Sequence, residues 1–181
     1  MQNSIIAGLF SILGTIVGWW LNNLSQKGKI QIYVKNASEK FTKRNENGFD
    51  DSCDKLDAMS YKFNVLLDIY NSSREISIMR NIDFIFEDKK RKIFCEVPLD
   101  VTNHVMNDIV IGRYKTVSII NVPPKSAINL AMHVYIEQKD ENWNFLGDIN
   151  KIKIRYYNNK NRPKTKVIYH RKNNDSRALT C

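Results

Sequence analysis

Apolar and polar side chains alternate along most of the chain after residue 28. In the clearest run, apolar residues occupy every second position from Ile128 to Ile136, while His133 and Glu137 fall on the opposite side. Strict alternation of this kind is typical of a β-strand with one buried face. No segment after residue 28 sustains the period of about 3.6 residues that marks an amphipathic helix. The pattern therefore predicts a mainly β domain.

The alternating runs divide into short strands separated by turn residues. Residues 36–57 lose the alternation and predict a long polar loop, with one helical turn near Ser52–Leu56. Pro98 indicates an edge or the end of a strand, because proline cannot donate to a sheet. The strands are expected within residues 29–35, 61–69, 76–86, 93–101, 109–111, 115–122, 128–136, 143–149, 151–157 and 164–169.

Many short strands with turns between them predict an antiparallel β-sandwich, or else a small barrel. The roughly 145 residues available exceed the ~100 of a minimal sandwich, so a core of adequate size is expected. The architecture resembles immunoglobulin-like sandwiches. The Cys-Trp-Cys spacing of a true immunoglobulin domain is absent, so the resemblance concerns the architecture alone.

The first 26 residues contain no charged side chain, and residues 5–21 are mostly apolar. As a helix, about 20 residues span roughly 30 Å, which is the thickness of a bilayer core. A cleaved signal peptide would need a basic start, and an interfacial helix would need a charged face; the segment has neither. A buried soluble helix of this length rarely lacks charge on every face. We therefore expect one N-terminal transmembrane helix over residues 1–26.

Residues at the end of the apolar run indicate its orientation. Trp19 and Trp20 are expected at the membrane interface, followed by Lys27 and Lys29. Because basic residues follow the run and none precedes it, the positive-inside rule places the N-terminus outside and the soluble domain in the cytoplasm. Three cysteines without a CxxC pair agree with a reducing compartment. The expected location is the cell membrane, crossed once.

Small residues recur along the expected anchor at a spacing of four. They are Ala7, Ser11 and Thr15, with Gly14 and Gly18 as a second series. Such stripes let membrane helices approach closely, so the anchor could form a homo-oligomer. The alternative is an anchor without a specific partner, because glycine is common in membrane helices.

The formal net charge of +9 comes from the C-terminal part of the chain. Residues 150–181 hold ten basic residues and one acid, whereas the first 149 residues hold 18 of each sign. If the last two strands pair as a hairpin, their cations would share one face, and like charges placed opposite each other would favour a compensating anion. The candidate anion- or lipid-binding residues are Lys151, Lys153, Arg155, Lys160, Arg162, Lys164 and Lys166.

Three interpretations fit this basic hairpin. It could be a solvated surface without a ligand. It could contact the anionic inner leaflet, at about 1 kcal/mol per basic residue near the surface. It could also bind nucleic acid or a nucleotide, which is less favoured because Tyr157 alone offers an outward aromatic ring for stacking.

The sequence holds no recognisable catalytic or metal-binding motif. The four glycines outside the anchor are isolated, which excludes a P-loop and a dinucleotide fingerprint, and the three histidines lack metal-ligand spacing. Glu96 and Asp100, four residues apart in one strand, would lie about 13 Å apart, too far for shared acid–base work. We expect no catalytic residue, no metal and no cofactor, and therefore no enzyme.

The chain divides into a transmembrane anchor at 1–26, a strand and polar loop at 27–58, a sandwich body at 59–171 and a flexible tail at 172–181. The expected function is the binding of an unknown protein partner at the cytoplasmic face of the membrane. One alternative is a membrane effector of a defence or mobile-element system, in which the β domain senses a ligand and the helix acts on the membrane. The other is nucleic-acid or nucleotide binding. The Ile-, Lys- and Asn-rich composition points to a low-GC bacterium.

Overall fold

The computed structural model describes residues 2–26, 28–102 and 114–171. A helix, α1 (Gln2–Gln26), precedes the β domain. Two short 3-10 helices follow later, η1 (Lys55–Asp57) and η2 (Asn144–Gly147). The strands are β1 (Ile30–Arg44), β2 (Asp50–Ser52), β3 (Ser60–Asn71), β4 (Ser77–Asp88), β5 (Ile93–Glu96), β6 (Leu99–Asp100), β7 (Lys115–Thr116), β8 (Ile119–Val122), β9 (Ala127–Glu137), β10 (Ile149–Tyr157) and β11 (Pro163–His170).

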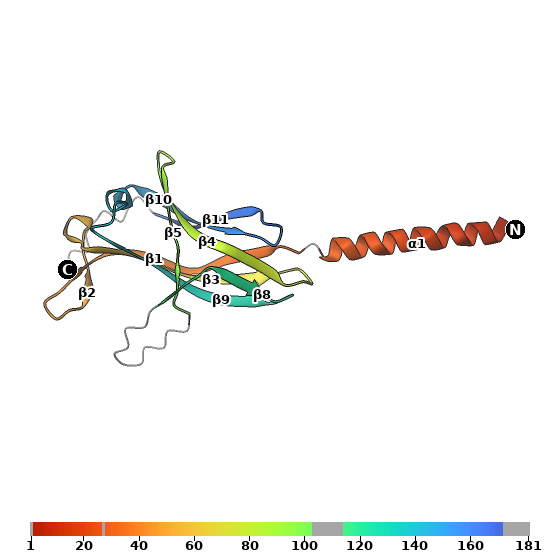
Figure 1. Ribbon diagram of the computed structural model, residues 1–181, viewed down its shortest axis with the longest axis horizontal. Helices are drawn as coiled ribbons and strands as arrows, with labels where there is room; N and C mark the ends of the chain where they lie inside the picture. The colour runs from red at the N-terminus through yellow and green to blue at the C-terminus, as the bar shows by residue number, and fades with distance from the viewer. Residues whose placement is uncertain (1, 27, 103–113, 172–181) are drawn as a thin grey trace.

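The strands of the described chain form two antiparallel sheets that face each other (Figure 1). The first sheet has the order β2-β1-β3-β9-β6-β7, and the second has the order β11-β10-β4-β5, with β8 also paired to β4. Two separate sheets make the domain a β-sandwich, as predicted, and not a barrel.

Aromatic side chains from both sheets fill the space between them. Phe63 of the first sheet packs edge-on against Phe84 of the second, with ring centroids 5.7 Å apart. Phe86 stacks on Phe94 at 4.6 Å and also contacts Tyr61 at 6.3 Å. Each fully buried phenylalanine contributes about 1.5–3 kcal/mol through the burial of apolar surface. This core joins the two sheets into one domain.

The first part of the domain differs from the sequence prediction. β1 continues to Arg44 and pairs with β3 over most of its length, so residues 36–44 are strand where a loop was expected. The predicted helical turn near 52–56 is present as η1 at Lys55–Asp57. Within the predicted segment 27–58, residues 30–44 and 50–52 are thus part of the first sheet.

Two predicted strands are each divided between the two sheets. Residues 93–101 form β5 in the second sheet and β6 in the first, and the change of sheet falls at Val97-Pro98, where proline predicted a strand end. Residues 115–122 likewise form β7 and β8. The predicted strand at 143–149 is wrong, since η2 occupies most of it. The predicted strand at 109–111 and the predicted tail at 172–181 lie outside the described residues.

The N-terminal segment is helical, as predicted, and α1 extends away from the two sheets (Figure 1). Its described apolar side chains are exposed, among them Phe10, Ile16 and Trp19. The predicted transmembrane role is not confirmed, because within the described residues no helix is long and apolar enough to cross a membrane. Polar side chains such as Ser11 and Thr15 interrupt its apolar run.

Candidate functional site

The two ends of the sandwich carry different loops. The chain passes from α1 into the sandwich at one of these ends, which we call the helix-proximal end. It is formed by residues 28–29, 72–76, 123–126 and 158–164. Hydrogen bonds hold these segments together, for example from Ser72 Oγ to the Lys29 carbonyl at 3.0 Å and from Asn159 Nδ2 to the Ile76 carbonyl at 2.9 Å. β2 lies at the opposite end, which we call the distal end (Figure 1).

Three of the predicted binding cations lie on the outer face of β10 and are paired within the protein. Lys151 Nζ lies 2.7 Å from Glu87 Oε1, and Lys153 Nζ pairs with Oε2 of the same carboxylate. Arg155 donates from Nε and Nη2 to Asp83 Oδ2 at 3.1 and 2.7 Å. The anions expected to compensate these strands are therefore carboxylates of the neighbouring strand β4.

The Glu87 carboxylate is nearly enclosed, with 8% of its side chain exposed. Hydrogen bonds from Lys151 and then Lys153 lower its pKa and outweigh burial, which acts in the opposite direction. Glu87 is therefore ionised at neutral pH. Two carboxylates, Glu87 and Asp83, thus pair the three cations of the outer face of β10 within the protein.

Lys164 and Lys166 do not share that face. In the antiparallel register, Lys166 stands opposite Ile154 and Lys164 opposite Tyr156, so both lie on the inward side of the edge strand β11. Lys166 Nζ donates to the Ile32 carbonyl of β1 and lies 5.7 Å from the Tyr33 ring. The predicted face of five cations is thus wrong, because a register shift near Ile152 reverses the orientation of the first half of β11.

Lys160 and Arg162 are exposed at the tip of the hairpin, as predicted. Asn158 Oδ1 accepts the backbone N–H groups of both residues, at 3.1 and 3.0 Å, and fixes the turn. The tip belongs to the helix-proximal end through the Asn159–Ile76 hydrogen bond. These two cations thus lie in a different environment from Lys151, Lys153 and Arg155.

The predicted packing residues of the anchor lie on α1. Thr15 Oγ1 donates to the Ser11 carbonyl at 2.9 Å, and a side-chain atom added at Gly14 or Gly18 would meet nothing within 4 Å. Trp19 and Trp20 are 66% and 56% exposed. Lys29 is exposed at the start of β1. Lys27 and the side chain of Ala7 lie outside the described residues.

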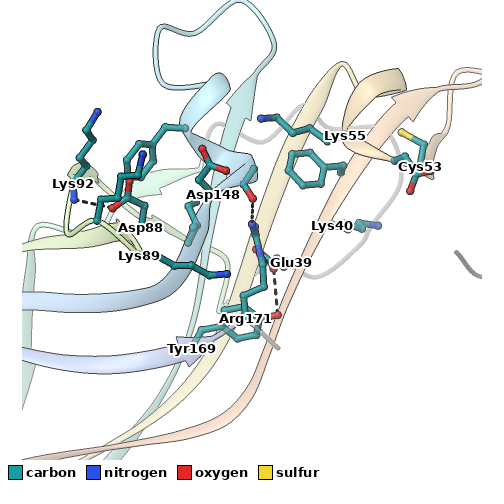
Figure 2. A pocket seen from close by; sticks show the side chains of 16 residues that line it. Glu39, Lys40, Cys53, Lys55, Asp88, Lys89, Lys92, Asp148, Tyr169 and Arg171 are labelled. Atoms are coloured by element: carbon teal, nitrogen blue, oxygen red, sulfur yellow. Dashed lines mark hydrogen bonds and ion pairs between the residues drawn. The ribbon is translucent and has the colours of Figure 1, made fainter. Parts of the chain in front are cut away.

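A cavity of about 750 Å³ opens at the distal end, between the end of β1, the β4–β5 turn and η2 (Figure 2). Its volume lies within the range of small-molecule sites. Phe41, Phe145 and Tyr169 supply aromatic surface to its wall. Its charged lining residues are Glu39, Lys40, Asp54, Lys55, Asp88, Lys89, Lys90, Lys92, Asp148 and Arg171.

A partly buried ion pair forms one wall of the cavity and joins the two sheets. Arg171, which follows β11, donates from Nε and Nη2 to the two oxygens of Glu39 on β1, at 2.5 and 2.6 Å. Tyr61 Oη donates to the same carboxylate at 2.7 Å. Arg171 Nη1 also donates to the carbonyls of Leu146 and Gly147, at 2.9 and 3.1 Å. Arg171 thus ties β1 and η2 to the end of β11.

The electrostatics of this pair stabilise its charged form. Burial opposes the charge of Arg171, but the hydrogen bonds and charge of Glu39 outweigh burial and raise the pKa of the guanidinium. Burial, followed by the charge of Glu39, raises the pKa of Tyr61 well above its usual range. Over the physiological range of pH, the cavity wall therefore carries the Arg171 guanidinium, and Tyr61, buried behind Glu39, is a neutral phenol.

Several lysines around the cavity form no ion pair with a carboxylate in the part of the chain that the structure describes. Lys55 Nζ donates to the Asn144 carbonyl at 2.8 Å, whereas no ion pair of Lys40, Lys89 or Lys90 occurs within the described chain. In Figure 2 the Lys89 side chain points toward Arg171 and Glu39. Glu39 is neutralised by Arg171, and the five lysines of the lining outnumber its other three carboxylates, so the cavity itself is suited to a negatively charged group.

Sequence reasoning missed this cavity. Glu39 fell within the predicted loop, and Arg171 was one of ten basic residues near the C-terminus without a distinct signal. One feature of the sequence could have revealed Glu39. After one extra residue, Ala37, Glu39 and Phe41 continue the alternation of β1, which places a carboxylate on an apolar face.

The acid pair and His133, which lie within the described residues, are not brought together; His104 lies outside them. Glu96 and Asp100 belong to β5 and β6, which lie in different sheets. His133 is half-buried on the outer face of the first sheet, where its Nδ1 lies 2.9 Å from Asn64 Oδ1 and burial lowers its pKa. Among the described residues, no group of three or more His, Cys, Asp or Glu side chains is placed to hold a metal ion.

These features define an antiparallel β-sandwich with a charged cavity at one end. Residues 28–169 match the family model described as the YopI Ig-like domain, so the chain belongs to the YopI Ig-like domain family. The immunoglobulin-like architecture expected from the strand pattern is therefore confirmed. No curated protein matches the sequence.

Comparison with solved structures gives distant matches. A protein from Archaeoglobus fulgidus is 12% identical, with 77% of this chain and 98% of that chain covered and a TM-score of 0.39. A β-sandwich protein from Clostridium difficile 630 is 8% identical, with 80% and 91% covered and a TM-score of 0.38. The putative ApaA protein from Bordetella pertussis is 10% identical, with 80% and 91% covered and a TM-score of 0.33.

Proposed function

We propose that this protein is a non-enzymatic binding module, attached to the cytoplasmic face of a membrane through α1, whose distal cavity binds a small phosphate-bearing ligand. An Ig-like β-sandwich suits an interaction module, and binding is the coarse function that the fold supports. The observation that carries the ligand proposal is the distal cavity, in which lysines without an ion pair among the described residues surround the Glu39–Arg171 pair.

Membrane attachment is supported by the N-terminal segment. No charged residue occurs in the first 26 residues. The described apolar side chains of α1 are exposed, so the sandwich does not bury them. An exposed apolar helix is stabilised by a lipid environment, and the basic residues after it favour a cytoplasmic domain. Retention of the full chain in the membrane fraction after alkaline extraction is expected, and its complete release would contradict the attachment.

A phosphate-bearing ligand is supported by the chemistry of the distal cavity. Lysine ammonium groups bind phosphate as point charges, and the rings of Phe41, Phe145 and Tyr169 could cover an apolar portion of the ligand. The cavity faces away from α1, so it would remain accessible from the cytoplasm when the helix is in a membrane.

The test is a thermal shift of the full chain in neutral nanodiscs with pyrophosphate and with ATP. At a ligand concentration of about 100 times Kd, binding adds about 2.7 kcal/mol, which corresponds to roughly 5–10 °C for a chain of this size. Lys89→Glu should remove the shift, whereas Lys160→Glu at the helix-proximal end is the matched control and should retain it. Equal shifts in both variants, or none in the natural protein, would contradict the ligand proposal.

The two alternatives make different predictions. In the effector alternative α1 acts on the membrane, so exchange of α1 for an unrelated membrane helix should abolish permeabilisation; in the tether proposal the exchange leaves function intact. Nucleic-acid binding through the basic hairpin has less support than the sequence pattern alone suggests, because Lys151, Lys153 and Arg155 already pair with Glu87 and Asp83. Binding of duplex DNA by the full chain would favour that alternative.

A further inference from the structure

The helix-proximal end carries a strong excess of positive charge. Its four segments contain six basic residues and one acid, Glu75. All six basic side chains are exposed, and within the described chain none of them forms an ion pair. The six residues are Lys29, Arg74, Lys125, Lys160, Arg162 and Lys164.

This charge is specific to one end of the domain. The distal segments 45–59, 88–92 and 138–148 hold nine acidic and six basic residues. The folded domain therefore has a basic end from which α1 leaves and a mixed, slightly acidic end opposite to it. The sequence alone does not reveal this segregation, since the six residues come from four separate segments.

The basic end is held in a fixed shape by a buried asparagine. Asn71 is fully buried, and its Nδ2 donates to the carbonyls of Glu75, Val122 and Pro123, at 2.7, 3.0 and 3.1 Å. Its Oδ1 accepts the backbone N–H of Ser73 at 2.9 Å. One side chain thus joins segments 72–76 and 123–126.

The exit of α1 is fixed to the same segments. Gly28 lies so close to the backbone of Ser72 and Ser73 that a side chain at this position would collide with it. Lys125 Nζ donates to the Ser72 carbonyl at 2.5 Å, which places a cation beside the exit of the helix. The cations are therefore presented around the point at which the chain passes from the helix to the sandwich.

We propose that the helix-proximal end binds the headgroups of anionic phospholipids in the membrane to which α1 attaches the domain. The inference rests on the attachment through α1 and is independent of the distal cavity. If α1 enters a membrane, this end is the part of the sandwich nearest to the surface, where charges interact over a Debye length of about 8 Å. Each basic residue near an anionic surface strengthens the contact about fivefold. Headgroup binding would direct the distal cavity toward the cytoplasm.

The test measures backbone hydrogen exchange of the full chain in two kinds of nanodisc. One contains phosphatidylcholine alone, and the other contains about 30% phosphatidylserine, which gives an anionic surface. Exchange in residues 72–76 and 158–164 should be at least fivefold slower in the anionic discs. At about 1 M salt, where the Debye length is about 3 Å, the difference should disappear.

Paired variants locate the contact. Lys160→Glu with Arg162→Glu should remove the protection, whereas Lys89→Glu with Lys90→Glu at the distal end should retain it. Unchanged melting temperatures in both double variants exclude unfolding as the cause.

Three results would overturn the inference, and they differ in what else they contradict. Release of the chain by alkaline extraction refutes the attachment and the headgroup contact together. Equal exchange in both discs, with the chain retained in the membrane, refutes the headgroup contact alone. Protection by duplex DNA in neutral discs, without an effect of phosphatidylserine, assigns the basic end to nucleic acid instead.

Discussion

The ion pairs between β10 and β4 give the sharpest test of whether the cations of β10 are paired within the protein. Replacement of Glu87 by glutamine keeps the size of the side chain but removes the negative charge between Lys151 and Lys153. The new amide nitrogen would face an ammonium group, so that two donors oppose each other. The two lysine side chains are 28% and 24% exposed, so both ammonium groups would lose their anion in a partly dehydrated environment.

The magnitude follows from one lost hydrogen bond, at the new amide nitrogen, and from the lost negative charge in the other, which the amide oxygen still accepts. A hydrogen bond to a charged group contributes about 1.5–3 kcal/mol, and partial exposure lets each lysine recover some hydration. We expect Glu87→Gln to reduce the free energy of unfolding by about 2–3 kcal/mol, which corresponds to a fall in Tm of roughly 5–10 °C. Denaturant unfolding of the natural protein and the variant measures the difference. Glu75→Gln, in an exposed loop, is the matched control and should change stability by less than about 0.5 kcal/mol.

The difference should also depend on pH in a defined direction. The pKa of Glu87 is lowered in the folded protein, first by the hydrogen bond from Lys151. Its contribution to stability is therefore fully present above the ordinary carboxylate pKa and is lost as the pH falls through the lowered value. The stabilities of Glu87→Gln and the natural protein should converge in acid. A loss below about 0.5 kcal/mol at neutral pH, or a difference that grows in acid, would refute the role of Glu87 as the internal partner of both lysines.

Two further predictions concern the wall of the cavity and the exit of the helix. Glu39→Gln should lower the free energy of unfolding by about 3 kcal/mol, because it leaves the Arg171 guanidinium, 18% exposed, without its anion. An effect as small as that of a surface substitution would contradict the role of the pair in joining the two sheets. Gly28→Ala should lower the free energy of unfolding by about 1–3 kcal/mol and speed hydrogen exchange in residues 72–76, because the added methyl group displaces the Ser72–Ser73 backbone. Unchanged exchange would show that the fold does not need this close approach.

The accuracy of the sequence predictions follows the continuity of the alternation. β3 and β9 pair without a register shift, and both were predicted nearly in full. In β1 an extra residue between Val34 and Asn36 changes the inward positions from even to odd numbers, so the continuation of the strand has the appearance of a loop. Asn81 interrupts the alternation of β4 in a similar way, through a positive φ of 49°. As a result, Met79 and Ile82 are both buried although they are three residues apart. A search for strict alternation does not recognise a strand as continuous when it contains a single inserted residue.

The same effect explains what could be predicted of the candidate sites. The outward orientation of Lys151 and Arg155 was predicted correctly, because the alternation continues through this part of β10. Their carboxylate partners lie on β4, more than 60 residues earlier, and only the strand order reveals them. The distal cavity and the basic helix-proximal end each combine several separate segments, so neither has a local sequence signature.

The cytoplasmic attachment of the sandwich is tested most directly by Cys95. Cys95 is an exposed free thiol, whereas burial raises the pKa of Cys53 in the cavity wall and slows its reaction. Cells that produce the full chain are treated with a membrane-impermeant maleimide before and after permeabilisation, and labelling at Cys95 is measured by peptide mass spectrometry on the membrane fraction. We expect labelling only after permeabilisation. Labelling of Cys95 in intact cells would contradict the proposed orientation of the domain.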